Sequence, residues 1–219
     1  MALILCLETA TTNCSVVLSK DGALFARKED GSKNYSHAEK LHVFIEEILK
    51  ENNLSIADLD AIAVSKGPGS YTGLRIGVST AKGLCFSLDL PLISVPTLTC
   101  LALQVKPKKG FVIPMLDARR MEVYSTVFNS DLQQVRATKA EVLDEKSFAE
   151  FLDKDKVVFI GDGVEKFKGI CNHPNAEFIG GKLPSATEMC GLAEAKYKIS
   201  DTEDVAYFEP YYLKDFIAG

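Results

Sequence analysis

The chain has 219 residues, of which 47% are hydrophobic and 25% charged, so it can bury a core without a metal or a disulfide. Its net charge of −5 and its pI of about 5.3 argue against a chain that binds nucleic acid on its own, because proteins that neutralise many phosphates are normally basic. None of the six cysteines stands in a C-x-x-C pair, which argues against a zinc site and against a disulfide framework.

The first predicted elements form a small sheet. An apolar run at residues 3–7 ends at Glu8, and short strands follow at residues 15–18 and 23–27, joined by a Lys-Asp-Gly hairpin turn. The opening run has no cationic leader and is too short for a signal peptide or a membrane span. We therefore expect a cytoplasmic protein with no membrane contact.

Two helices and a buried strand complete the first half. Apolar residues at i, i+3, i+4, i+7 and i+8 predict a helix over residues 36–50, which Ser36 and Glu39 begin as a capping box. A buried strand is predicted at residues 61–65 and a second helix at residues 72–88. The apolar stripe of the first helix comprises Leu41, Phe44, Ile45, Ile48 and Leu49.

The second half repeats the plan of the first. A polar, proline-bearing break at residues 106–110 predicts lobes at residues 1–105 and 106–219. Beyond the break an apolar run again ends at an acid, Asp117, and a later buried strand again opens into glycines. The order predicts an α/β protein of two duplicated lobes, with ligands bound in the cleft between them. The expected elements are strands at residues 111–116, 123–128 and 157–160 and a helix at residues 185–198 begun by a capping box of Ser185 with Glu188.

The last residues are rich in aromatic side chains: Tyr207, Phe208, Tyr211, Tyr212 and Phe216. They either close the chain by docking on the core or form a contact surface, since aromatic residues are enriched at interfaces. We expect this tail to pack back on the first lobe.

The most informative stretch is Lys-Gly-Pro-Gly-Ser-Tyr-Thr-Gly-Leu-Arg-Ile-Gly at residues 66–77, between the buried strand and the second helix. A glycine-rich turn into a helix start can present backbone N–H groups to an anion such as the phosphates of ATP or ADP. The spacing is neither the dinucleotide fingerprint nor a P-loop, and Pro68 removes one N–H group. The candidate donors are Gly67, Gly69, Ser70 and Thr72.

The helix that follows this loop has a face of small residues, formed by Gly73, Gly77 and Ala81. A glycine inside a helix costs about 1 kcal/mol relative to alanine, so a close neighbour should compensate. That neighbour is either the chain's own sheet, which is the commoner case, or a helix of a partner. We interpret the loop chiefly as the rigid start of a helix built for a partner, with Arg75 held by a carboxylate such as Glu8, Asp117 or one of the partner's.

No metal site or nucleophile–base pair is predicted. His37 and His42 lie five residues apart, about 140° around a helix, whereas helical metal pairs are usually four apart. We expect His37 to pack or hydrogen-bond at the first helical turn. Glu8 and Asp117, at the ends of equivalent strands, either hold a cation, polarise water or bond the amides of the following turns.

Residues 66–77 resemble the signature of the bacterial TsaB family, also called YeaZ, although Tyr71 stands where that family usually has Phe. Further segments resemble the family's motifs in the same order along nearly the whole chain, most closely in the first half. These are Leu-Cys-Leu-Glu-Thr-Ala-Thr at residues 5–11, His-Ala-Glu at 37–39, Ala-Lys-Gly-Leu at 81–84, Pro-Leu-Ile-Ser-Val at 91–95, Met-Leu-Asp-Ala-Arg at 115–119 with Glu-Val-Tyr at 122–124, Gly-Asp-Gly at 161–163 and Pro-Tyr-Tyr-Leu-Lys at 210–214.

The resemblance implies an actin-like, sugar-kinase-like ATPase fold in two lobes and an accessory role in threonylcarbamoylation of the adenosine 3′ of tRNA anticodons. It implies pairing with TsaD, the catalytic paralogue that binds the metal, a further TsaE ATPase, a homodimer in isolation, and access to tRNA only through the complex. In that family the two helices of the first lobe make the contacts. In this chain the corresponding helices cover residues 36–50 and 72–88. The resemblance therefore implies a partner surface that comprises His37, Leu41, Phe44, Gly73, Arg75, Gly77 and Ala81.

Departures from the catalytic relatives agree with an accessory role. Ala10 stands where ATPases of this fold have a glycine near the strand-end acid, and Glu8 replaces the family's usual Asp. The His-x-x-x-His of the catalytic paralogue is missing, since His37 and His42 have the wrong spacing. We predict a non-catalytic scaffold that activates TsaD. The alternatives are an ATP-binding small-molecule kinase or ATPase of the same fold and, least favoured, a metallopeptidase.

Overall fold

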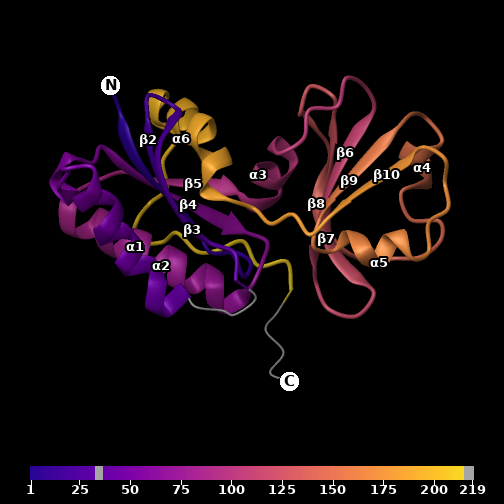
Figure 1. Ribbon diagram of the computed structural model, residues 1–219, viewed down its shortest axis with the longest axis horizontal. Helices are drawn as coiled ribbons and strands as arrows, with labels where there is room; N and C mark the ends of the chain where they lie inside the picture. The colour runs from indigo at the N-terminus through magenta and orange to yellow at the C-terminus, as the bar shows by residue number, and fades with distance from the viewer. Residues whose placement is uncertain (33–36, 215–219) are drawn as a thin grey trace. The chain divides into compact units, whose positions relative to one another are not determined.

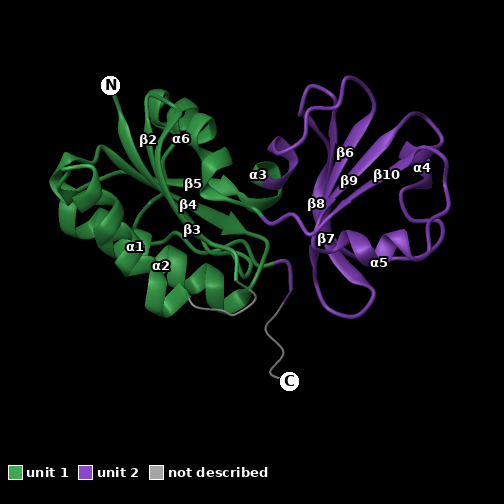
Figure 2. Cartoon of the chain, viewed as in Figure 1, with its two compact units in different colours: residues 1–100, 184–212 green, residues 101–183, 213–219 purple. Residues whose placement is uncertain are grey.

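The computed structural model describes residues 1–32 and 37–214 of the chain. It divides into two compact units (Figure 2): unit 1 comprises Met1–Cys100 and Pro184–Tyr212, and unit 2 comprises Leu101–Leu183 and Leu213–Gly219. This division differs from the lobes expected at residues 1–105 and 106–219. The chain enters unit 2 within a helix, α3 (Thr97–Leu103), and it returns to unit 1 at residue 184 because the last helix packs its buried side chains on the first sheet.

Unit 1 is built on one five-stranded sheet in the order β3-β2-β1-β4-β5 (Figure 1). Strand β1 pairs antiparallel with β2 and parallel with β4, so the hairpin and the buried strand expected from the sequence meet in one sheet. The strands predicted at residues 3–7, 15–18, 23–27 and 61–65 are confirmed. Their bounds are β1 (Leu3–Glu8), β2 (Cys14–Lys20), β3 (Ala23–Asp30), β4 (Ala61–Gly67) and β5 (Leu92–Pro96).

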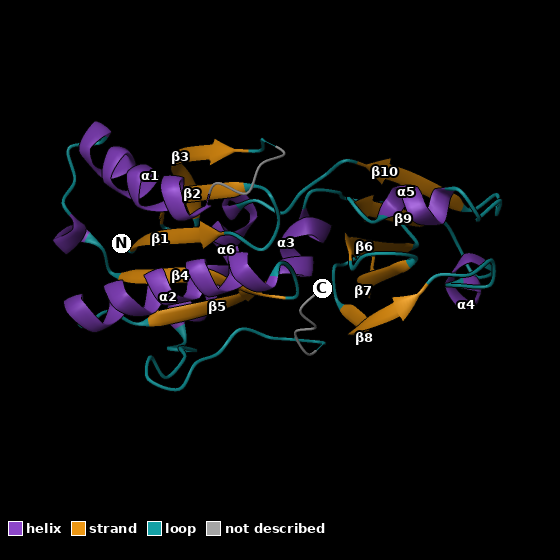
Figure 3. Cartoon of the chain, turned by 90° about the horizontal axis from the view of Figure 1, so that it is seen from below, coloured by secondary structure: helices purple, strands orange, loops and turns teal. Residues whose placement is uncertain are grey.

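Helices cover both faces of this sheet, which is why β1 and β4 are apolar along nearly their whole length. On one face α1 (His37–Glu51) packs on β2 and α2 (Tyr71–Leu88) packs on β4 (Figure 3). On the other face α6 (Met189–Lys198) contributes Met189, Cys190 and Ala193 to a second buried cluster. Both helices predicted in the first half are confirmed. Ser36, the expected cap of α1, lies outside the described residues.

The start of the last helix differs from the expected capping box. A short 3₁₀ turn, η2 (Ala186–Glu188), precedes α6, and Ser185 Oγ accepts from the backbone N–H of Thr187 at 3.2 Å rather than from Glu188. The tighter turn brings an earlier amide to the cap. Another 3₁₀ turn, η1 (Ile56–Asp58), precedes β4.

Unit 2 has a sheet of the same plan, in the order β10-β9-β6-β7-β8, and its strands predicted at residues 111–116, 123–128 and 157–160 are confirmed. Its core gathers phenylalanine rings from several strands and helices, with the centroids of Phe159 and Phe167 4.9 Å apart. The bounds are β6 (Phe111–Asp117), β7 (Glu122–Asn129), β8 (Gln134–Val142), α4 (Ala149–Leu152), β9 (Val157–Gly161), α5 (Val164–Lys168) and β10 (Ala176–Gly180).

The two sheets confirm the duplicated plan. In each sheet the first three strands form an antiparallel meander. The first strand also pairs parallel with the fourth strand, and the fourth pairs parallel with the fifth, which lies at the edge of the sheet. Strands β1 to β5 therefore correspond in order to β6 to β10. Among the described residues, no helix combines the length and apolar character that crossing a membrane requires.

Candidate functional site

The glycine loop between β4 and α2 bonds chiefly to its own unit. The N–H of Gly67 donates to Thr97 Oγ1 at 3.1 Å, the N–H of Ser70 donates to the Ala10 carbonyl at 2.6 Å, and the N–H of Gly73 donates to Ser70 Oγ at 3.3 Å. A side chain at Gly69 would overlap with the Ala10 carbonyl. The backbone of the glycine loop is therefore in direct contact with the backbone of the β1–β2 turn. Two of the candidate anion donors, Gly67 and Ser70, thus have partners within the chain, and anion binding here stays a prediction.

The small face of α2 packs against the end of β1. Thr9 Oγ1 donates to the Gly73 carbonyl at 2.8 Å, and a Cβ at Gly73 or at Gly77 would overlap with atoms of Thr9. Ala81, one turn further along, is fully buried in the core of unit 1. The glycines are therefore required by the chain's own fold. Of the two neighbours left open by the sequence, the chain's own end of β1 is the one seen here, and the place of these residues on a partner surface stays a prediction.

The first turn of α1 is held by the same β1–β2 turn. His37 is buried, and its Nε2 donates to the Thr11 carbonyl at 2.6 Å, which confirms the expected hydrogen bond. Burial lowers the pKa of His37, so the neutral ring is favoured. Leu41, the next apolar position, is fully buried beneath α1. Neither residue is exposed, and their place on a partner surface stays a prediction. Phe44 keeps partial exposure.

The strand-end acid of unit 1 is enclosed. Glu8 is fully buried, and its Oε1 accepts from the Ala10 N–H at 2.7 Å and from Ser65 Oγ at 2.8 Å. Its Oε2 has no hydrogen-bond partner among the described residues. Burial raises the pKa of Glu8 from an ordinary value of 4.5 to about 7. Asp117, the equivalent acid of unit 2, is exposed and accepts from the N–H of Arg119 at 2.6 Å. Of the roles left open by the sequence, both acids therefore bond the amides of the turns that follow them.

The burial of Glu8 predicts an unusual pH dependence. Because its pKa is raised on folding, the folded chain binds the proton more tightly, and the free energy of unfolding should fall as the pH rises from about 4.5 to about 7, by about 3 kcal/mol in total. Replacing Glu8 by glutamine keeps the shape and removes that loss. Urea denaturation should show near-equal stability of the two chains at pH 5 and a more stable Glu8→Gln chain at pH 8. If the unchanged chain has the higher free energy of unfolding at pH 8, the fold stabilises the ionised carboxylate and the prediction is wrong.

Arg75 contacts two aromatic side chains. Its Nε donates to the Tyr212 hydroxyl at 3.3 Å, and its guanidinium group lies 4.1 Å from the centroid of the Tyr71 ring. The rings of Tyr71 and Tyr212 are themselves 5.0 Å apart. Within residues 1–32 and 37–214 no carboxylate lies within ion-pair distance of Arg75, which corrects the expected pairing with Glu8 or Asp117 and leaves a carboxylate of a partner as a prediction.

The C-terminal tail docks on unit 1. The N–H of Tyr211 donates to the Lys66 carbonyl at 2.7 Å, and Lys82 Nζ donates to the carbonyls of Ala206 and Phe208. Val205 and Phe208 pack against the core beneath α2. The expected docking on the first lobe is therefore seen for the described part of the tail; Phe216 lies outside the described residues. Tyr207, which is 84% exposed, faces solvent.

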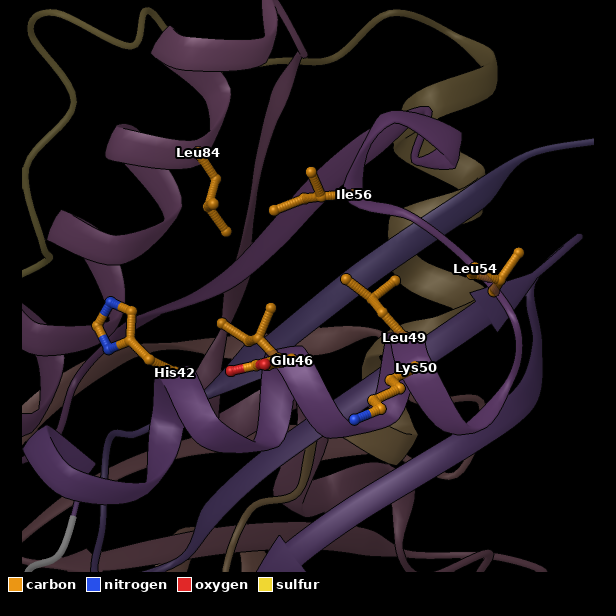
Figure 4. A pocket seen from close by; sticks show the side chains of 8 residues that line it. His42, Glu46, Leu49, Lys50, Leu54, Ile56 and Leu84 are labelled. Atoms are coloured by element: carbon orange, nitrogen blue, oxygen red, sulfur yellow. The ribbon is translucent and has the colours of Figure 1, made fainter.

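A groove of about 480 Å³ runs between α1 and α2 and has a mainly apolar lining. Figure 4 shows Leu84 of α2 and Ile56 of η1 on one side and His42, Glu46 and Leu49 of α1 on the other. The sequence placed Leu49 in the core stripe but did not reveal the groove, because Leu54 and Ile56 reach it only when the chain folds back after α1. The lining residues are His42, Ile45, Glu46, Leu49, Lys50, Leu54, Ile56 and Leu84.

The described residues contain no cluster of three or more His, Cys, Asp or Glu side chains with the spacing to hold a metal ion. The two histidines of α1 illustrate the reason. His37 is turned to the Thr11 carbonyl, whereas His42 lines the groove.

Comparison with known proteins gives full-length matches. The TsaD family model, described as tRNA N6-adenosine threonylcarbamoyltransferase, matches residues 32–218. The tRNA threonylcarbamoyladenosine biosynthesis protein TsaB of Escherichia coli strain K12 is 30% identical, over 98% of this chain and 96% of that protein. The protein of the same name from Bacillus subtilis strain 168 is 31% identical, over 96% of this chain and 93% of that protein. The solved structure of YeaZ from Pseudomonas aeruginosa is 27% identical with a TM-score of 0.83, over 97% of this chain and 100% of that chain.

Proposed function

The chain belongs to the TsaB family, and from that premise we propose that it is a non-catalytic subunit of a tRNA-modifying complex. In this proposal it binds and activates a TsaD-like transferase that places threonylcarbamoyl on the adenosine 3′ of tRNA anticodons, and it does so in the cytoplasm. The observation that carries the proposal is the match to TsaB proteins over nearly the whole of both chains. The match of the TsaD model supports a partner of the same fold.

The α1–α2 groove supports a partner-binding role. It places the apolar side chains of Ile45, Leu49 and Leu84 between charged and polar residues at its rim, as protein interfaces do. We propose that a TsaD-like paralogue occupies this groove in the complex, that a second copy of the chain occupies it in isolation, and that a TsaE-like ATPase joins the heterodimer.

The backbone contacts of the glycine loop favour this role over the ATPase alternative. The Ala10 carbonyl lies where a side chain at Gly69 would be, and it takes the N–H of Ser70. An incoming phosphate would have to displace this contact. In the proposed complex the chain therefore holds no nucleotide in its own loop, and tRNA is reached only together with the partner.

Light scattering after size exclusion tests the partner assignment. The chain alone should elute with the mass of a dimer, and addition of the TsaD-like protein should give a 1:1 heterodimer at the expense of the homodimer. Calorimetry with ATP and magnesium provides the comparison for the ATPase alternative, and no heat of binding is expected. A chain that stays monomeric, ignores the TsaD-like protein and binds ATP would overturn the proposal.

A further inference from the structure

The turn between β6 and β7 in unit 2 has an unusual backbone. Two consecutive arginines, Arg119 and Arg120, adopt left-handed conformations with φ of 71° and 48°. For residues other than glycine this region costs roughly 1–2 kcal/mol each, and such outliers gather at functional sites. Hydrogen bonds from Ala118 N–H to the Glu122 carbonyl and from Glu122 N–H to the Arg119 carbonyl close the turn. The backbone is thus fixed while both arginine side chains are exposed.

The acids around this turn are already engaged. Asp117 pairs with Lys166 Nζ at 2.7 Å, Glu122 pairs with Lys214, and Asp162 accepts from the N–H of Asp117 at 2.9 Å. Burial, the largest effect, raises the pKa of Asp162. The lysines therefore neutralise the neighbouring carboxylates, and the charge that is left over belongs to the two arginines.

Among the described residues, neither arginine side chain has an ion-pair or hydrogen-bond partner. Within the described part of the chain, no carboxylate lies within 4.0 Å of either guanidinium group, and neither side chain takes part in a hydrogen bond. Beside them lie two exposed apolar side chains: Met121 is 39% exposed and Val142 is 70% exposed. Val142 faces Glu122 in the β7–β8 register, and the N–H of Leu143 donates to the Met121 carbonyl, so these side chains belong to one surface.

We propose that this arginine turn, Arg119 and Arg120, binds phosphate groups of the tRNA on which the complex acts. The inference rests on the proposed function for the identity of the RNA. A guanidinium group presents a planar fork that matches two phosphate oxygens, and successive phosphates of an RNA strand supply an anion for each of two neighbouring arginines. A chain of net charge −5 has an overall electrostatic field that does not attract RNA. The proposed contact is therefore local, and it adds to the affinity that the partner protein has for the tRNA.

The test is the affinity of the purified complex for a transcribed tRNA over a series of salt concentrations. The Arg119→Glu, Arg120→Glu double variant should bind at least tenfold more weakly at 0.1 M salt, and the slope of log affinity against log salt should fall by about two. A matched double charge reversal in the same unit, Lys106→Glu with Lys108→Glu, alters two exposed lysines that have no ion pair in the described structure and should leave affinity and slope near their original values.

A second variant separates binding from folding. Arg119→Gly with Arg120→Gly removes the guanidinium groups and suits the left-handed backbone, so it should melt no lower than the unchanged chain while losing the same affinity. Equal tRNA affinity of the original and arginine variants would overturn the inference, as would an equal loss in the lysine control. If the arginine variants instead fail to assemble with the TsaD-like or TsaE-like protein, the turn is a protein contact and the RNA assignment is wrong. The proposed function is tested separately by assembly of the unchanged chain.

Discussion

Replacing Gly77 by leucine is expected to destabilise unit 1 strongly. Gly77 faces Thr9 so closely that even a Cβ would overlap with the threonine side chain, and Thr9 Oγ1 also bonds the Gly73 carbonyl. A leucine would separate α2 from the end of β1 and break the packing of Val78 and Ala81 on the sheet. We expect a loss of about 4 kcal/mol and a fall in melting temperature of roughly 10 °C or more, measured by circular dichroism.

The same helix provides the control. Gly83 lies on the exposed side of α2, with no atom within 4 Å of where its Cβ would be. Gly83→Leu should leave stability within about 1 kcal/mol and shift it upward, because leucine is the better helix former. A Gly77→Leu chain that folds normally and only loses its partner would restore the original expectation that this face meets another subunit.

Leu84→Glu is expected to abolish association while unit 1 stays folded. Leu84 is half-buried in the groove and lies across from α1, where Glu46 already contributes a negative charge. A carboxylate at this position would have to be desolvated beneath any partner that fills the groove. We expect affinity for a second copy and for the TsaD-like protein to fall about a hundredfold, measured by light scattering over a dilution series.

Ile199→Glu is the matched control, since Ile199 is 75% exposed beyond the end of α6 and does not line the groove. The Ile199→Glu chain should associate as the unchanged chain does. The melting temperatures of both variants should lie within a few degrees of that of the unchanged chain. Undiminished association of the Leu84→Glu chain would place the interface elsewhere.

The family and the duplicated plan could be predicted from the sequence because both depend on local patterns. Apolar runs that end at Glu8 and Asp117 mark equivalent strands, and the motif at residues 66–77 is specific. The two-lobe α/β fold and the TsaB likeness are confirmed by the full-length matches. In contrast, β8 was not predicted, because an edge strand with exposed charges such as Lys139 lacks a buried apolar run.

The candidate site could be predicted only in part, because it depends on contacts between segments that are distant in the sequence. The spacing of Gly73 and Gly77 predicts a close neighbour but does not say that the neighbour is Thr9 of the same chain. Arg75 finds Tyr212, 137 residues away, which no local pattern encodes. The groove likewise needs Leu54 to fold back beside α1. The two helices are therefore predictable from the sequence, whereas the groove between them, which we propose as the partner surface, depends on these distant contacts.

The most direct test of the account is the yield of threonylcarbamoyladenosine in a reconstituted reaction. TsaD-like and TsaE-like proteins, tRNA and threonylcarbamoyl-adenylate are mixed with the unchanged chain, with its Leu84→Glu variant or without it. Modification is predicted only in the first mixture, and the chain alone should modify no tRNA. An equal yield without the chain, or modification by the chain alone, would contradict its assignment as a non-catalytic activating subunit.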